Sequence, residues 1–161
     1  MTSPISCSKP VACSLDGHTI AGGLMLALAC DYIAIGTRKI FRLGITGPIV
    51  GIPYPLKAVK LVQHQLEPQL AYRLLVDGQL YSSTDIPLRC IRGENPDELA
   101  RQWLDMLLVR PLDAFEITKK KWWSDYTRLD CLDNTDEKTD YFQAVTSNEC
   151  LQAMEKALTK S

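Results

Sequence analysis

The chain has 161 residues, of which 46% are hydrophobic, and its formal net charge is −1 at pH 7. This length is enough for one folded domain with a buried core, and the composition excludes a disordered or fibrous chain. The near-zero charge also excludes the strongly basic surface that nucleic-acid binding requires. The basic run Lys119 to Lys121 is too short for that role, and we interpret it as a solvated helix face.

No stretch of the sequence predicts a membrane span. The longest apolar run, Leu24 to Cys30, is about a third of the length that a transmembrane helix needs. Residues 1–10 carry neither the apolar core of a signal peptide nor the pattern of a transit peptide, and residues 159–161 are not a peroxisomal tripeptide. We therefore expect a cytoplasmic protein.

Cysteine and histidine usage argues against disulfides and metal ligation. No two cysteines have C-x-x-C spacing and no secretory signal precedes them, so we expect reduced thiols. His18 and His64 have no clustered partners that could complete a tetrahedral zinc site, so we expect no metal. The six cysteines are Cys7, Cys13, Cys30, Cys90, Cys131 and Cys150.

The first part of the chain predicts a strand, a helix and a second strand. The run from Lys9 to Leu15 is a short, partly β-branched segment that ends at the turn Asp16-Gly17. Gly22-Gly23 then opens a buried helix that reaches Cys30 and ends at Asp31, and residues 32–35 form the next strand. Glycines and prolines interrupt residues 41–55, which we expect to form a loop.

The second part is mainly helical. Leu56, Val59 and Val62 predict one helix, and residues 70–75 a second helix that stops at Asp77-Gly78. Asn95 caps a third helix whose core-facing stripe is expected at Leu99, Trp103, Met106, Leu107 and Val109. We expect a fourth helix over residues 113–123, a loop or frayed turn over residues 125–138 and a last helix from Ser147, which together indicate an α/β or α+β fold.

A turn with two glycines at the start of a helix places unpaired backbone N–H groups at a positive helix end. Gly22 and Gly23 could therefore hold a negative oxygen, or could merely let the helix pack closely on the strand. A phosphate-binding loop is excluded, because Gly23-Leu24 stands where such a loop needs a lysine and a hydroxyl.

Three successive segments resemble the crotonase (enoyl-CoA hydratase/isomerase) superfamily. They are KPVACSLDGHTIAGGLMLALACDYIAI, FRLGITGPIVGIPYP, and the segment from Leu75-Val76-Asp77-Gly78 to Tyr81-Ser82. The resemblance implies a ClpP/crotonase-like ββα spiral that is truncated at its N-terminus. Compared with a complete family domain, we expect roughly a hundred residues to be missing there. It divides the chain into a partial spiral core over residues 1–90 and a C-terminal helical region over residues 91–161.

The resemblance also implies a ligand and a site. Family members hold an acyl-CoA thioester oxygen with two backbone N–H groups. Gly22 matches one donor position, with Gly23 as a further candidate, and the second donor belongs to family sequence that precedes Met1. His18 and Ala21 match positions beside the acyl group, although His18 could instead only satisfy a backbone carbonyl. No cofactor is implied, because CoA arrives as part of the substrate.

The chain departs from the family at both glutamates that a hydratase uses. Met25 and Gly47 stand at those positions, although counting from Phe41 instead of Gly51 places Ile45 at the second one. None of these side chains transfers protons, so we expect no hydratase activity. Asp31 is the nearest carboxylate, and we interpret it as a structural cap.

Other departures lie in the framework. Pro87 falls where the family continues with an alanine-rich helix, which proline would break. His64 is expected on a surface helix. We interpret Trp103, Trp122 and Trp123 as helix-packing residues.

Three interpretations remain open at this stage. The chain could be an enzyme that isomerises or hydrolyses acyl-CoA thioesters with an unidentified base. It could instead be a non-catalytic member that covers its exposed sheet edges by joining full-length crotonase subunits, which assemble as trimers in this family. It could also be an incomplete gene model of a longer chain.

Overall fold

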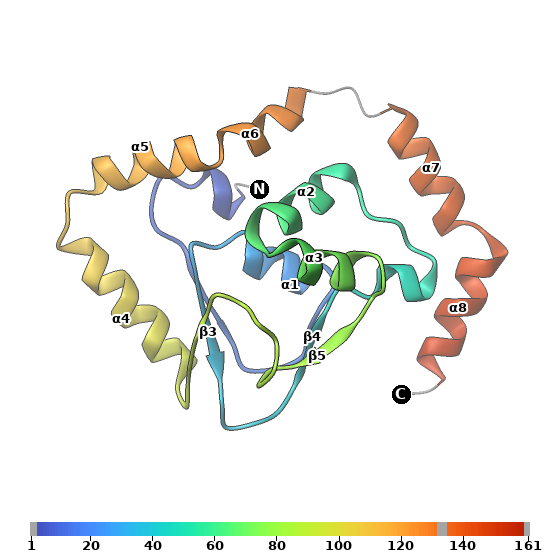
Figure 1. Ribbon diagram of the computed structural model, residues 1–161, viewed down its shortest axis with the longest axis horizontal. Coiled ribbons are helices and arrows are strands. Elements are labelled where there is room, and N and C mark those ends of the chain that lie inside the picture. Colours follow the sequence, from blue (N-terminus) through green and yellow to red (C-terminus); the bar gives the residue numbers. More distant parts are fainter. Residues whose placement is uncertain (1–2, 132–134, 160–161) are drawn as a thin grey trace.

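The computed structural model describes residues 3–131 and 135–159. Short strands and short helices alternate in the first half of the chain, and helices follow in the second half (Figure 1). The elements of the first half are η1 (Pro4–Ser6), β1 (Ala12–Leu15), β2 (Thr19–Ile20), α1 (Gly22–Leu28), β3 (Tyr32–Gly36), β4 (Arg42–Gly44), η2 (Gly47–Val50), α2 (Leu56–Gln65), α3 (Pro68–Leu75) and β5 (Leu80–Ser82).

The second half begins with β6 (Ile91–Gly93) and continues with α4 (Pro96–Leu108), α5 (Leu112–Trp122), α6 (Ser124–Thr127), η3 (Arg128–Cys131), α7 (Thr135–Val145) and α8 (Asn148–Leu158). In Figure 1, α4 and α5 border the sheet that contains β3, while α7 and α8 lie on the opposite side of the molecule, beyond η2.

The strands form two small sheets. In the first, β3 lies between β1 and β6 and is parallel to both, with Cys13 opposite Ile33. In the second, β4 pairs in parallel with β2 and antiparallel with β5. In the first sheet β1 is an edge strand and β3 is the central strand. Because these two strands are parallel, the chain crosses from one to the other through α1.

The main hydrophobic core lies between these sheets and α1, α2 and α3. The helices bury their apolar faces there because the strand surfaces that face them are also apolar. The buried cluster consists of Leu15, Leu24, Ala27, Leu28, Ile33, Ile35, Phe41, Leu43, Ile45, Val62, Leu70, Ala71, Leu74, Leu75, Ile86 and Leu88.

Most predicted elements of the first half are confirmed. The strands at residues 9–15 and 32–35 and the helix opened by Gly22 all form. The interpretation of residues 41–55 as loop was incomplete, because they also contain β4 and η2. Strands of two or three residues have no periodicity of their own and exist through pairing with neighbours, as β2 does with β4.

The ends of two helices follow the sequence signals. The Asn95 side chain accepts a hydrogen bond from the Glu98 N–H at 3.3 Å, and Ser147 caps α8 by accepting one from the Cys150 N–H at 3.2 Å. Gly78 has φ +64°, the left-handed conformation that glycine adopts after a helix.

Two predictions for the second half are wrong. Residues 125–138 were expected to form a loop or frayed turn, but their described part lies in α6, η3 and the start of α7, while residues 132–134 lie outside the described residues. Met106 and Val109 were expected in the core-facing stripe of α4, but they are 45% and 86% exposed. The rest of the predicted stripe is confirmed, because Leu107 is buried and Leu99 and Trp103 are half-buried, and Ala100 joins them where α4 packs against β1 and β3.

The aromatic residues of the second half divide between packing and exposure. Trp103 stacks on Tyr32 with ring centroids 4.8 Å apart and so joins α4 to β3. Trp123 is buried, whereas Trp122 is 60% exposed and is therefore no core residue. His64 is exposed on α2 as expected, although its ring also meets those of Trp122 and Trp123.

The segment after β5 forms no helix between residues 83 and 90, as Pro87 predicted. The Arg92 guanidinium on β6 holds this segment by donating hydrogen bonds to the carbonyl oxygens of Ser83 and Ile86, at 3.2 and 2.7 Å. β6 begins one residue past residue 90, the predicted boundary, and pairs with β3 of the first part. The division into residues 1–90 and 91–161 stays a prediction.

Among the described residues, no helix is long and apolar enough to cross a membrane.

Candidate functional site

The glycine turn lies between β2 and α1 and is held to the second sheet. The Ala21 N–H donates a hydrogen bond to the Gly44 carbonyl oxygen of β4 at 2.8 Å. Ala21 has φ +52° and ψ −118°, which is a conformation that favours glycine and strains an alanine. The chain therefore enters α1 through a backbone turn that the surrounding structure enforces.

Gly22 and Gly23 form the exposed first turn of α1. Among the described residues, neither N–H has a hydrogen-bond acceptor, as expected at a helix start without a capping side chain. A methyl group added at Gly22 would meet no atom within 4 Å, and one at Gly23 would make an ordinary contact of 3.6 Å with Thr19. Close packing on the described residues therefore does not require either glycine.

The other residues predicted beside the glycine turn have structural surroundings. Met25 is half-buried and packs against two hydrophobic clusters. His18 is exposed, and its Nδ1 accepts a hydrogen bond from the Arg42 N–H at 3.0 Å. This partner is thus a backbone amide and not the carbonyl that the sequence suggested.

Gly47, which is predicted to match the second family glutamate, is buried and has no free space around it. The Gly47 N–H donates a hydrogen bond to the Tyr54 hydroxyl oxygen at 2.6 Å. A Cβ at Gly47 would lie 2.5 Å from both Cζ and the hydroxyl oxygen of Tyr54 and 2.6 Å from the Ile52 carbonyl oxygen. Any side chain at residue 47 would therefore displace Tyr54. Ile45, the alternative from the sequence, is fully buried in the core.

Tyr54 was not identified from the sequence. Its phenol accepts the Gly47 N–H, so its own proton stays available for a further acceptor. Burial raises the pKa of Tyr54, and Tyr141 raises it further, against the opposing effect of the Gly47 hydrogen bond. The hydroxyl is thus a neutral hydrogen-bond donor at neutral pH. An aromatic hydroxyl between Pro53 and Pro55 is the signal that could have pointed to it.

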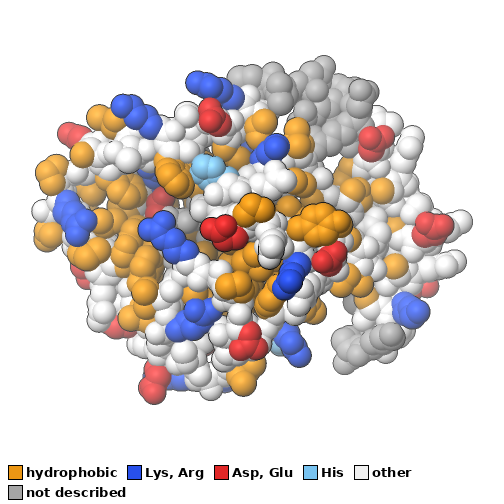
Figure 2. Space-filling model, viewed as in Figure 1, with side chains coloured by type: hydrophobic (Ala, Val, Ile, Leu, Met, Phe, Trp, Pro, Cys, Tyr) orange, Lys and Arg blue, Asp and Glu red, His pale blue; other side chains and the backbone are white. Residues whose placement is uncertain are grey.

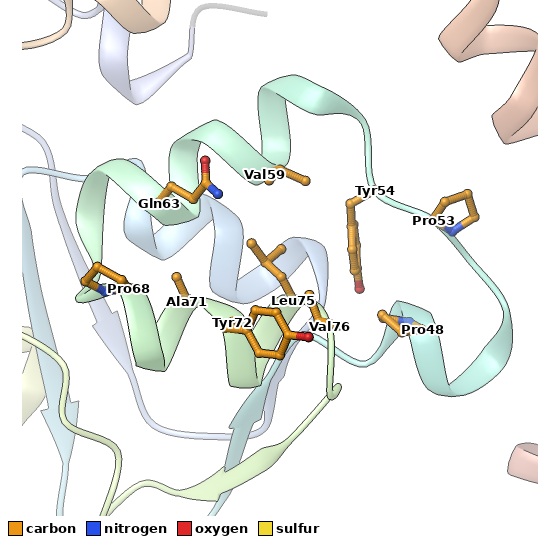
Figure 3. A pocket seen from close by; sticks show the side chains of 10 residues that line it. All are labelled: Pro48, Pro53, Tyr54, Val59, Gln63, Pro68, Ala71, Tyr72, Leu75 and Val76. Atoms are coloured by element: carbon orange, nitrogen blue, oxygen red, sulfur yellow. The ribbon is translucent and has the colours of Figure 1, made fainter.

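Tyr54 lines an apolar pocket between α2, α3 and the loop before α2 (Figure 3). The pocket has a volume of about 530 Å³. Figure 2 shows hydrophobic side chains scattered among charged ones on this face of the molecule, and Tyr72 and Val76 are more than half exposed here. The lining residues are Pro48, Pro53, Tyr54, Val59, Gln63, Pro68, Ala71, Tyr72, Leu75 and Val76. The pocket thus adjoins the Gly47 position, while the residues of the glycine turn are not part of its described lining.

Asp31 has a structural environment. Its Oδ2 accepts hydrogen bonds from the Val11 N–H at 2.8 Å and from the Lys119 ammonium at 2.5 Å, and Lys119 also donates to the Lys9 carbonyl oxygen. Both side chains of this ion pair are nearly buried. Lys119 was predicted to be solvated with Lys120 and Lys121. That prediction is wrong for Lys119, because it anchors α5 to the end of α1.

A second hollow, the α5 groove, runs between α5, β3, the end of α2 and residues 88–91. Its volume is about 680 Å³, and its lining includes Cys30, Asp31, Cys90, Lys119 and Trp123. The described cysteines (Cys7, Cys13, Cys30, Cys90 and Cys150) are free thiols, and the side chain of Cys131 lies outside the described residues. Among the described residues, no three histidine, cysteine or acidic side chains are grouped as a metal site would need.

Comparison with known proteins decides the family. The enoyl-CoA hydratase/isomerase family model matches residues 2–160. This chain belongs to the enoyl-CoA hydratase/isomerase family. The crotonase resemblance and the crotonase-like α/β fold predicted from the sequence are therefore confirmed. No curated protein matches the chain significantly.

Solved structures of family members share the fold. An enoyl-CoA hydratase from Mycobacterium avium is 22% identical, with a TM-score of 0.78 over 98% of this chain and 62% of its own. Methylmalonyl-CoA decarboxylase is 15% identical, with a TM-score of 0.76 over 99% of this chain and 64% of its own. Its complex with 2S-carboxypropyl-CoA gives 0.77 over 98% and 62%, at 14% identity. This chain therefore spans less than two thirds of the length of these structures.

Proposed function

We propose that this family member binds acyl-CoA thioesters, with the thioester oxygen at the start of α1 and the Gly22 N–H as one donor. The observation that carries the proposal is the open space at Gly22. Packing on the described residues gives no reason for glycine there, whereas close approach of a ligand does. The free N–H groups lie at the positive end of the helix, which favours a negative oxygen. Gly23 is a secondary donor, and Ala21 and His18 border the ligand.

Hydration of an enoyl-CoA is not part of this proposal. Activating a water needs groups that accept and donate protons, but Met25 is a thioether packed in the core and Gly47 has no side chain. Adding a carboxylate at residue 47 would require Tyr54 to move. The second oxyanion donor is not assigned to any of the described residues. No cofactor is needed, because CoA is carried on the substrate.

A second candidate reaction, favoured by Tyr54, is the loss of CO2 from a malonyl-type CoA thioester. In such a reaction the C–C bond to the substrate's own carboxylate breaks, its electron pair forms the thioester enolate, and the enolate then takes up a proton from water. No protein base is required, in agreement with the residues at positions 25 and 47. The Tyr54 hydroxyl is a neutral donor that could hold the departing carboxylate in the apolar pocket. A structural neighbour of this chain is methylmalonyl-CoA decarboxylase.

Variants at two open glycines test the binding proposal. Gly22→Pro removes the donor at a helix position that tolerates proline, while Gly17→Ala is the matched control, because Gly17 also has open space around it. Calorimetry with crotonyl-CoA, methylmalonyl-CoA and 2S-carboxypropyl-CoA should show binding to the wild type and the control, and at least tenfold weaker binding to Gly22→Pro. Equal affinity of all three proteins, each checked for folding by circular dichroism, would contradict the proposal.

Turnover assays distinguish the loss of CO2 from the hydration of an enoyl-CoA. Release of CO2 from methylmalonyl-CoA without hydration of crotonyl-CoA would support the second candidate, and Tyr54→Phe should then lower the rate. Hydration of crotonyl-CoA by the wild type would contradict the roles given to Met25 and Gly47.

The non-catalytic alternative concerns assembly. β1 and β2 lie at the edges of their sheets, and edge strands attract further strands. In this alternative the chain joins full-length family members as a trimer-type homo- or hetero-oligomer in the cytoplasm and turns over no thioester. Size-exclusion chromatography with light scattering, with and without crotonyl-CoA, tests it: a well-folded monomer that gains no partner from added full-length subunits would contradict it.

A further inference from the structure

Two thiols meet at the C-terminal end of α1, away from its glycine turn. Cys13 lies on β1, and its Sγ contacts the Ala27 carbonyl oxygen at 3.9 Å. Cys30 follows α1, and its Sγ contacts the neighbouring Leu26 carbonyl oxygen at 3.4 Å. The two contacted carbonyls belong to adjacent residues, so both sulfurs lie at the same turn of α1, and a hydrogen bond between the thiols shifts the pKa of each. The β1–α1 crossover therefore brings together two cysteines that are separated in sequence by the whole glycine turn and α1.

The surroundings distinguish the two sulfurs. Cys30 lines the α5 groove next to Asp31 and Lys119, whereas Cys13 lies behind it and is not part of the described lining. The hydrogen bond from Cys13 lowers the pKa of Cys30 and the Lys119 ammonium lowers it further, against burial and the Asp31 carboxylate. The same hydrogen bond and burial raise the pKa of Cys13. Cys30 is therefore the sulfur that ionises first.

We propose that Cys13 and Cys30 form a reversible dithiol–disulfide site that reacts, through the α5 groove, with low-molecular-weight disulfides such as glutathione disulfide. The site is independent of the acyl-CoA proposal, since it needs neither Gly22 nor any turnover.

The reaction takes place in two balanced steps. The Cys30 thiolate attacks one sulfur of the small disulfide, the S–S bond breaks, and one small thiolate leaves and takes up a proton. Cys13 then loses its proton and attacks the Cys30 sulfur, which expels the second small thiol. The protein loses two hydrogen atoms as the Cys13–Cys30 bond forms, and the small disulfide is reduced to two thiols.

The remaining described thiols provide internal controls. Cys90 lines the same groove, but burial raises its pKa and only Arg92 acts in the opposite direction. Cys150 is buried against Gly51, while Cys7 is half-buried near the N-terminus. A reaction governed by access alone would modify Cys7 and Cys90 at least as fast as Cys30. A reaction governed by the thiol pair selects Cys30.

The test treats the reduced protein with glutathione disulfide and maps the products by mass spectrometry without reduction. Chymotrypsin is required to separate Cys30, because Pro10 blocks tryptic cleavage after Lys9 and leaves Cys7, Cys13 and Cys30 in one peptide; fragmentation of the chymotryptic peptide that holds both Cys7 and Cys13 then shows which of the two is cross-linked. The wild type should yield the Cys13–Cys30 cross-link with release of two glutathione molecules. Cys13→Ala should stop at a glutathione adduct on Cys30, while Cys30→Ala should leave Cys13 at least tenfold less modified than Cys30 was.

Cys90→Ala is the matched control in the same groove and should form the cross-link at the wild-type rate. Circular dichroism checks each variant for folding. If an alanine variant at residue 13 or 30 does not fold, the time course of the wild type decides, because an adduct on Cys30 must precede the cross-link. Adducts on Cys7 or Cys90 without a Cys13–Cys30 cross-link would overturn the proposal.

Discussion

Gly22 and Gly47, which we propose to match two positions of the family's site, are glycines for opposite physical reasons. Around Gly22 the space is open, and its N–H is free among the described residues. Around Gly47 the space is taken by Tyr54, which also uses the Gly47 N–H. The first glycine is suited to the approach of a ligand, whereas the second makes room for a side chain of the protein itself. The same residue type therefore leaves open space in one loop and accommodates a neighbouring side chain in the other.

Placing a glutamate at Gly47 should give the largest effect. Gly47→Glu forces Tyr54 out and buries a carboxylate, so the free energy of unfolding should fall by roughly 3 kcal/mol or more. Urea denaturation measures this change. The double variant Gly47→Glu with Tyr54→Ala should lose less free energy of unfolding than the two single variants lose in sum. The cavity left by the ring accommodates the new side chain. Strict additivity would show that Tyr54 does not fill this position.

Removing only the Tyr54 hydroxyl should have a smaller effect. Tyr54→Phe leaves the buried Gly47 N–H without its partner and should cost about 1–2 kcal/mol at pH 7. The pKa of Tyr54 is raised in the folded state, so the unfolded chain ionises first as pH rises. The contribution of the raised pKa to the free energy of unfolding is complete below the ordinary tyrosine pKa near 10. It is lost as pH rises through the folded value. Urea titrations from pH 7 to 11 should show this loss in the wild type and not in Tyr54→Phe.

Relieving the strained turn should stabilise the protein. Ala21 has φ +52°, so Ala21→Gly should raise the free energy of unfolding by about 1 kcal/mol, once the greater flexibility of glycine in the unfolded chain is subtracted. Thermal unfolding compares it with Ala58→Gly, a control within α2 that should destabilise by about 1 kcal/mol. A destabilised Ala21→Gly would contradict the strain at this turn.

The smallest effect on stability is expected at Gly22 itself. Gly22→Ala meets no atom within 4 Å and should change the free energy of unfolding by less than about 0.5 kcal/mol. The same variant should weaken acyl-CoA binding, because its methyl group occupies the space proposed for the ligand. A large loss of stability would instead show that the glycine serves packing, and unchanged binding would contradict its role beside the ligand.

Local signals in the sequence determined much of the framework. The Asn95 and Ser147 caps, the turn at Gly78 and the run that ends in Cys30-Asp31 each depend on neighbouring residues, so they can be recognised without the fold. The order of the family's segments also identified the crotonase-like fold, while the roles given to Gly22, Met25 and Gly47 stay predictions. These features follow from backbone preferences and from spacing along the chain.

The tertiary structure decided which residues fill the space between those segments. Tyr54 reaches Gly47 across a loop. Lys119 reaches Asp31, and Cys13 reaches Cys30, although the partners are far apart along the chain. Lys119 appeared solvated in the sequence because its neighbours are lysines, yet α5 turns it alone toward a buried carboxylate. Strands as short as β2 and β4 likewise form only when their partner is in place. Periodicity cannot report such contacts, because burial and charge pairing depend on which elements meet.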